Sequence, residues 1–84
     1  MQNLDLKDTV ELMLSDNYKD RFKAEYYQLK TRRDKLHAMI VKYAAGSLDF
    51  EPSCPLELLE VQEKAMDEYL KILEVRAEIE KIEL

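Results

Sequence analysis

Lysine and arginine are concentrated in one stretch of this 84-residue chain. Positions 19 to 42 hold eight basic residues against three acidic ones, a net charge of +5, whereas the whole chain carries −5 and the remainder therefore −10. The basic residues are Lys19, Arg21, Lys23, Lys30, Arg32, Arg33, Lys35 and Lys42. Such a segment in an acidic protein suits a small anionic ligand or an acidic partner, because proteins that bind bulk nucleic acid normally carry an overall basic field. The same charges would also suit a solvated face that pairs with acidic residues of a neighbouring helix.

Arg33 stands in the middle of an otherwise apolar stripe. Residues spaced alternately by four and three fall on one face of a helix, and here they are Phe22, Tyr26, Leu29, Arg33, Leu36, Ile40 and Tyr43. A guanidinium in an apolar seam is costly without a counter-charge, so Arg33 either pairs with a carboxylate (Glu25, Asp67 or Glu68) or stacks on a tyrosine. Alternatively, Arg33 faces a pocket together with Arg32 and Lys30 and binds an anion.

Signatures of catalysis are weak. His37 and Cys54 are the single histidine and the single cysteine, and no His/Cys/carboxylate cluster has the spacing of a metal site. There is no glycine-rich phosphate loop. We therefore expect a protein that is not an enzyme and uses no cofactor. The first residues lack the features of a signal peptide, and no apolar run approaches the roughly 20 residues of a membrane span, which predicts a cytoplasmic protein without a membrane partner.

Helix start and stop signals predict one all-α domain over residues 1–84. A short helix is expected at about 5–14, with Asp8 and Glu11 as its capping box and an apolar side formed by Leu6, Val10, Met13 and Leu14. A long helix at about 16–45 starts after the cap signal at 15–17 and ends at Gly46. After a loop at 46–54, in which Leu48 and Phe50 plug the end of the molecule, a third helix is expected at about 55–81, capped by Ser53 or Cys54.

The third helix carries two apolar stripes, which predicts an oligomer. One stripe packs on the preceding helix in an antiparallel hairpin, a register that sets Leu36 near Met66, Arg33 near Tyr69, Leu29 near Leu73 and Tyr26 near Arg76. The other stripe would be bare on a monomer, and it comprises Leu58, Val61, Ala65, Ile72 and Ile79. Each exposed aliphatic side chain forgoes roughly 1.5–3 kcal/mol of burial, and such patches commonly mark interfaces. We therefore expect a homo-oligomer with closed symmetry.

Two motifs connect the chain with a known family. The first long helix opens with Tyr-x-x-Arg and Glu-x-x-x-Leu from Tyr18 to Leu29 and continues to the pair Lys35-Leu36. The third helix reads Leu-x-x-Gln-x-x-x-Met-x-x-Tyr-x-x-x-Leu-x-x-Arg from Leu59 to Arg76. Over about residues 16 to 80 the chain resembles the helical-hairpin sponges with which phages counter CBASS immunity, a hairpin that recurs in sponges against Thoeris immunity.

The resemblance implies a mechanism without catalysis. Such sponges assemble as oligomers, often hexamers, with ligand sites between subunits, and they sequester cyclic oligonucleotide signals in the cytoplasm of the host bacterium. For this chain we expect a homo-oligomer between a dimer and a hexamer. An aromatic residue near the start of the first long helix stacks on a base, and Tyr18 matches it. A basic residue further along contacts phosphate, and Lys30, Arg32 and Arg33 are the candidates. Arg21 belongs to the opening motif, and Arg76 is a candidate for a second site. The alternative is a phage protein–protein interaction module without a nucleotide ligand.

Overall fold

The chain is described by a computed structural model over residues 5–84. A 3₁₀ turn, η1 (Leu6–Thr9), continues into a single helical turn, α1 (Val10–Met13), and two long helices follow, α2 (Tyr18–Ala45) and α3 (Leu56–Glu80). Residues 5–84 contain no strand, so the all-α prediction is confirmed. The element expected at about 5–14 is shorter than predicted and only partly α-helical.

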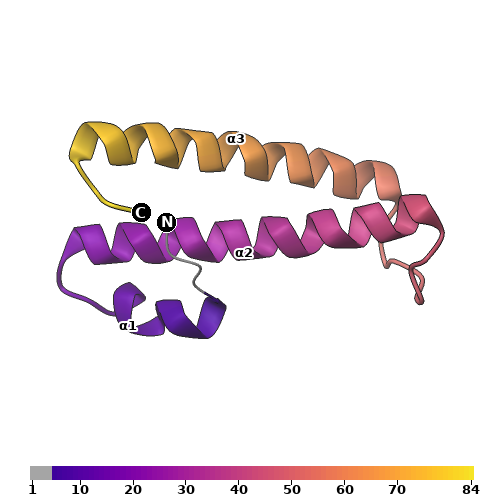
Figure 1. Cartoon of the computed structure of the whole chain (residues 1–84), viewed down its shortest axis with the longest axis horizontal. Helices are drawn as coiled ribbons and strands as arrows, with labels where there is room; N and C mark the ends of the chain where they lie inside the picture. Colours follow the sequence, from indigo (N-terminus) through magenta and orange to yellow (C-terminus); the bar gives the residue numbers. More distant parts are fainter. Residues whose placement is uncertain (1–4) are drawn as a thin grey trace.

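The two long helices lie side by side and run in opposite directions, with α1 packed on the other side of α2 (Figure 1). The longest dimension of the molecule is 43 Å. Among residues 5–84, three side-chain hydrogen bonds cross from α2 to α3, and they join Tyr26 to Glu74, Arg33 to Asp67 and His37 to Glu63. The two residue numbers of each pair add up to 100, so the register is constant along this part of the seam.

The predicted register is wrong by two residues. It set Arg33 beside Tyr69 and Tyr26 beside Arg76, whereas each donor instead meets a carboxylate, Asp67 and Glu74 respectively. The physical reason is that a guanidinium and a buried hydroxyl both require an acceptor at the seam. The observed register supplies both acceptors at once.

The ends of α2 follow from local sequence. The Asn17 side chain accepts a hydrogen bond from the backbone N–H of Lys19 at 2.9 Å and so caps the first turn. Gly46 terminates the helix in the left-handed conformation at φ 76°. The N–H of Ser47 then donates to the carbonyl of Lys42 at 2.9 Å, which closes the last turn.

The ends of α3 differ from the prediction. Pro55 precedes the helix without any side-chain cap, so the expected caps at Ser53 and Cys54 are wrong. At the other end Lys81 takes the left-handed conformation with φ 59°, and the N–H of Ile82 donates to the carbonyl of Ala77 at 2.9 Å. This closure is the Schellman arrangement, with lysine in the position that glycine usually occupies. It turns the chain back toward α2 (Figure 1).

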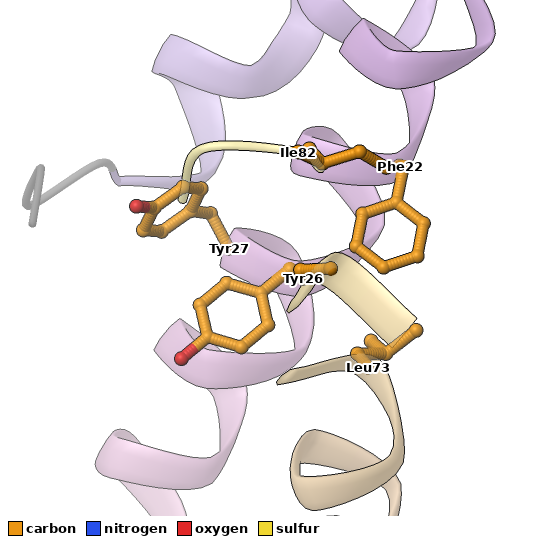
Figure 2. Close-up of a cluster of buried hydrophobic side chains, with 6 residues drawn as sticks. Phe22, Tyr26, Tyr27, Leu73 and Ile82 are labelled. Carbon is orange, nitrogen blue, oxygen red and sulfur yellow. The ribbon is translucent and has the colours of Figure 1, made fainter. Parts of the chain in front are cut away.

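The buried core lies at one end of the long helices. It consists of Phe22, Tyr26, Tyr27, Leu73, Ala77 and Ile82 (Figure 2). The Tyr26 and Tyr27 rings meet edge to face with centroids 5.1 Å apart, a favourable aromatic geometry. Between positions 28 and 72 no residue is buried. The half of the pair nearer the connecting loop is therefore only thinly packed within one chain.

The loop and the N-terminal turn also depart from expectation. Phe50 is 56% exposed, so it does not plug the end of the molecule. The capping box of the first turn is formed by Asp5 and Asp8 rather than by Asp8 and Glu11. The buried residue of this region is Thr9, which accepts a hydrogen bond from Gln28, whereas much of the predicted apolar side is exposed: Val10, Met13 and Leu14.

The second apolar stripe of the third helix is exposed to solvent in the single chain, as expected for a monomer. Leu58, Val61, Ile72 and Ile79 are between 56 and 73% exposed. Within residues 5–84 neither long helix has an apolar stretch that would cross a bilayer.

Candidate functional site

Tyr18 and Arg76 lie at the same end of the molecule. Tyr18 is the first residue of α2, and its ring is half exposed. Arg76 stacks over the Phe22 ring, 4.9 Å from the centroid, and its Nε donates to Glu80 at 2.8 Å. The hydrogen bond to Glu80 raises the pKa of Arg76, and the neighbouring Glu25 and Tyr18 raise it further. This end therefore offers a flat aromatic surface close to a permanent cation.

Arg21 supports the segment that precedes α2. One of its terminal nitrogens donates to the backbone carbonyl of Ser15 at 2.7 Å. The Ser15 hydroxyl in turn donates to Asp20 at 2.8 Å. Arg21 is exposed and stays within reach of a ligand at the Tyr18 end, but part of its hydrogen-bonding capacity is used to hold the chain.

A second group of candidates lies midway along the seam, around a groove of about 310 Å³. Lys30 and Arg33 line it from α2, and Lys71 lines it from α3. Sequence reasoning missed Lys71, although the correct register would have placed it next to Leu70, the residue opposite Lys30. Three carboxylates also line the groove, from Asp34, Asp67 and Glu74, so its formal charges balance.

Arg33 is engaged by these carboxylates. Its Nε donates to Asp67 at 2.7 Å, and a terminal nitrogen contacts Asp34 at 3.4 Å. The hydrogen bond to Asp67 raises the pKa of Arg33. Lys30 pairs with the same Asp34 at 3.2 Å. The predicted Arg–carboxylate pair is thus confirmed with Asp67 as the partner, and the stacked Arg–Tyr arrangement is not observed.

Arg32 points away from this groove. Consecutive residues of a helix are separated by about 100° around its axis, so Arg32 and Arg33 serve different faces. Arg32 is exposed, and within residues 5–84 it forms no salt bridge.

The structure does not bring all candidates together within one chain. Tyr18 and Lys30 are twelve residues apart on the same helix, which corresponds to about 18 Å along its axis. Tyr18, Arg21 and Arg76 form one group at the end of the molecule. Lys30 and Arg33 form another in the middle of the seam.

A larger cavity of about 680 Å³ lies beside the returning C-terminal segment. Its charged lining consists of Glu74, Glu78, Glu83 and a single Lys81. Because this lining is predominantly acidic, it disfavours an anionic ligand. None of the predicted site residues lines it.

Residues 5–84 contain no cluster of three or more His, Cys, Asp or Glu side chains placed to hold a metal ion. His37 lies beside Glu63 at 3.0 Å, and Cys54 is exposed in the loop. Neither residue lines the two cavities described above.

A protein-family model described as Sequestin matches residues 16–79. The match spans all of α2 and all but the last residue of α3. No curated protein and no solved structure matches the chain.

Proposed function

Because the chain belongs to the Sequestin family of anti-CBASS and anti-Thoeris sponges, we propose that it binds and sequesters cyclic oligonucleotide second messengers without cleaving them. The observation that carries this proposal is the family match, which covers both long helices rather than one repeated motif. The proposed ligands are cyclic di- and trinucleotides. The protein acts in the cytoplasm of a bacterium infected by the phage that encodes it.

The Tyr18 end supports the proposal chemically. A cyclic dinucleotide presents two bases and two phosphates. A base stacked on an exposed aromatic ring gains roughly 1–3 kcal/mol, and the half-exposed ring of Tyr18 is available for this contact. The guanidinium groups of Arg21 and Arg76 at the same end are suited to phosphate.

The separation of the two candidate groups supports an oligomer in which ligands bind between copies. Tyr18 lies about 18 Å along the helix from Lys30, too far for both to hold one compact cyclic dinucleotide in a single chain. In an oligomer, cationic residues of a neighbouring copy would complete the site at the Tyr18 of the first. The proposed assembly is a homo-oligomer of between two and six copies.

Thermal-shift measurements with cyclic dinucleotides, cyclic trinucleotides and cyclic ADP-ribose isomers test this function, with native mass spectrometry for stoichiometry. At least one of these ligands should raise the melting temperature and be recovered intact after the protein is denatured. A flat response to the whole panel would overturn the proposal. Recovery of a linear or hydrolysed nucleotide would contradict its non-catalytic part.

The bare apolar face of α3 favours a second candidate, a module that clasps another protein. Large exposed apolar patches are typical of protein interfaces. This function requires that a defined partner protein co-purifies with the chain while no cyclic nucleotide changes its melting temperature.

A further inference from the structure

The outer face of α3 has the spacing of a coiled-coil seam. Its residues, here called the α3 outer stripe, follow one another at intervals of three and four: Leu58, Val61, Ala65, Glu68, Ile72, Val75 and Ile79. All seven are exposed, and in Figure 1 no other element covers the side of α3 that faces away from α2. Glu68 is the one charged residue in this stripe.

A second face of α2, which shares Leu36 and Tyr43 with the Arg33 stripe, has the matching spacing. The α2 outer stripe consists of Tyr18, Arg21, Glu25, Arg32, Leu36, Met39 and Tyr43, at intervals of three, four or seven. Its first half is polar and its second half is apolar. Leu36 and Met39 are partly exposed, and Tyr43 is 45% exposed.

We propose that a second copy of this chain seats its α2 outer stripe on the α3 outer stripe, with Arg32 of one copy opposite Glu68 of the other. The inference deepens the homo-oligomer of the proposed function by naming the contacting faces. It does not depend on nucleotide binding.

Charge complementarity favours a second copy of this chain as the partner of the α3 outer stripe. α2 carries eight basic and three acidic residues, and α3 carries eight acidic and three basic ones, so the helices have net charges of +5 and −5. Within residues 5–84 the side-chain pairs between these helices that involve a Lys, Arg or His of α2 are Arg33–Asp67 and His37–Glu63. A second copy would bring two further basic residues of α2, Arg21 and Arg32, opposite acidic residues of α3.

The register follows from aligning the two stripes in the same direction with an offset of 36 residues. Arg32 then faces Glu68, and the apolar halves coincide in the pairs Leu36–Ile72, Met39–Val75 and Tyr43–Ile79. The same offset sets Arg21 opposite Glu57. This offset leaves one charge, Glu25, facing an aliphatic residue, Val61. In the opposite direction, with Arg32 still facing Glu68, two charges would do so, because Glu25 would lie on Val75 and Arg21 on Ile79.

The surface of α3 is hollowed where this register needs it. A groove of about 370 Å³ is lined by Glu68, Lys71, Ile72, Val75 and Arg76. Leu36 and Met39 of the second copy would enter this groove as knobs enter holes in a coiled coil. Arg32 of the second copy would reach Glu68 at one end of this groove.

Charge reversal tests the contact by sedimentation without nucleotide. Wild type should sediment as an oligomer at micromolar concentration. Glu68→Arg alone and Arg32→Glu alone should each weaken association by about tenfold or more, because like charges then face each other. An equimolar mixture of the two variants should associate as wild type does, since every contact between unlike copies regains an opposite pair.

Glu60→Arg is the matched control, because Glu60 is an exposed glutamate of α3 outside the stripe, and it should leave association unchanged. Circular dichroism at the same concentration checks that each variant is helical. A monomeric wild type, an unaffected Glu68→Arg variant, or a mixture that stays dissociated would overturn the inference. Loss of nucleotide response in an intact oligomer would instead count against the proposed function.

Discussion

Arg33 and Asp67 tie the two long helices together at the middle of their seam, with the Nε of Arg33 2.7 Å from Oδ1 of Asp67. The Arg33 side chain is only 26% exposed, whereas that of Asp67 is 47% exposed. The pair is thus half shielded from water. Its contribution to stability lies between that of a surface ion pair and that of a buried one.

Substitution of either partner should destabilise the fold modestly. We expect Arg33→Ala and Asp67→Asn each to lower the free energy of unfolding by about 1 kcal/mol. Urea denaturation at a fixed protein concentration measures this change. The exposed Lys35 serves as control, since Lys35→Ala should change stability by less than about 0.5 kcal/mol. If Asp67→Asn has no effect while Arg33→Ala does, the loss comes from packing of the arginine stem and not from the ion pair.

Tyr26 should make stability fall at alkaline pH. Burial raises the pKa of Tyr26 above its ordinary value of 10.0, and its hydrogen bond to Glu74 raises it further. The folded chain therefore keeps this proton where the unfolded chain releases it. The contribution is complete below pH 10 and is lost as the pH rises from there toward the folded-state pKa.

The measurement is the free energy of unfolding as a function of pH for wild type and Tyr26→Phe. The variant should be less stable by about 1 kcal/mol at neutral pH and should lose less stability above pH 10. Tyr27→Phe is the matched control, because the Tyr27 hydroxyl is equally buried but has no hydrogen-bond partner among residues 5–84. Parallel pH curves for wild type and Tyr26→Phe would contradict the assignment.

Local signals predicted α2 well because each signal acts within a few residues. The Asn17 cap and the left-handed Gly46 are properties of short segments. The sequence predicted Gly46 directly and placed the cap within residues 15–17. The end of α3 was less clear because Lys81 takes the position usual for glycine, which no propensity indicates. There the buried Ile82 closes the turn, a tertiary contact that sequence spacing does not reveal.

The candidate site could be predicted only as a set of residue types. The sequence identified Arg33 as exceptional and Asp67 as one of three possible partners. It did not identify Glu74 as the acceptor for Tyr26 or Lys71 as part of the groove, because both depend on the register. A shift of two residues along a helix pair changes which groups meet while leaving the apolar pattern almost unaltered.

Tyr18 should contribute to ligand binding through stacking rather than to stability. Tyr18→Ala removes a half-exposed ring, so the melting temperature without ligand should stay close to that of wild type. A loss of roughly 1–3 kcal/mol of stacking weakens binding about 5- to 150-fold. Isothermal titration with the cyclic nucleotide that gives the largest thermal shift measures the change. Tyr69→Ala is the control, since Tyr69 is 42% exposed on α3 and belongs to neither outer stripe. An equal loss of affinity in both variants would mean that Tyr18 is not the stacking residue.

Gly46 and Lys81 end their helices in the left-handed conformation, so glycine should be the more stable residue at both positions. Lys81→Gly should stabilise the chain by about 0.5–1 kcal/mol, because a left-handed lysine costs roughly 1–2 kcal/mol and the greater freedom of unfolded glycine offsets part of the gain. Gly46→Ala should destabilise it by about 1 kcal/mol. A Cβ at Gly46 would meet no atom within 4 Å, so that cost arises from backbone conformation alone. Urea denaturation of both variants at the same concentration checks the signs. A stabilising Gly46→Ala or a destabilising Lys81→Gly would show that these helix ends do not hold the left-handed conformation in solution.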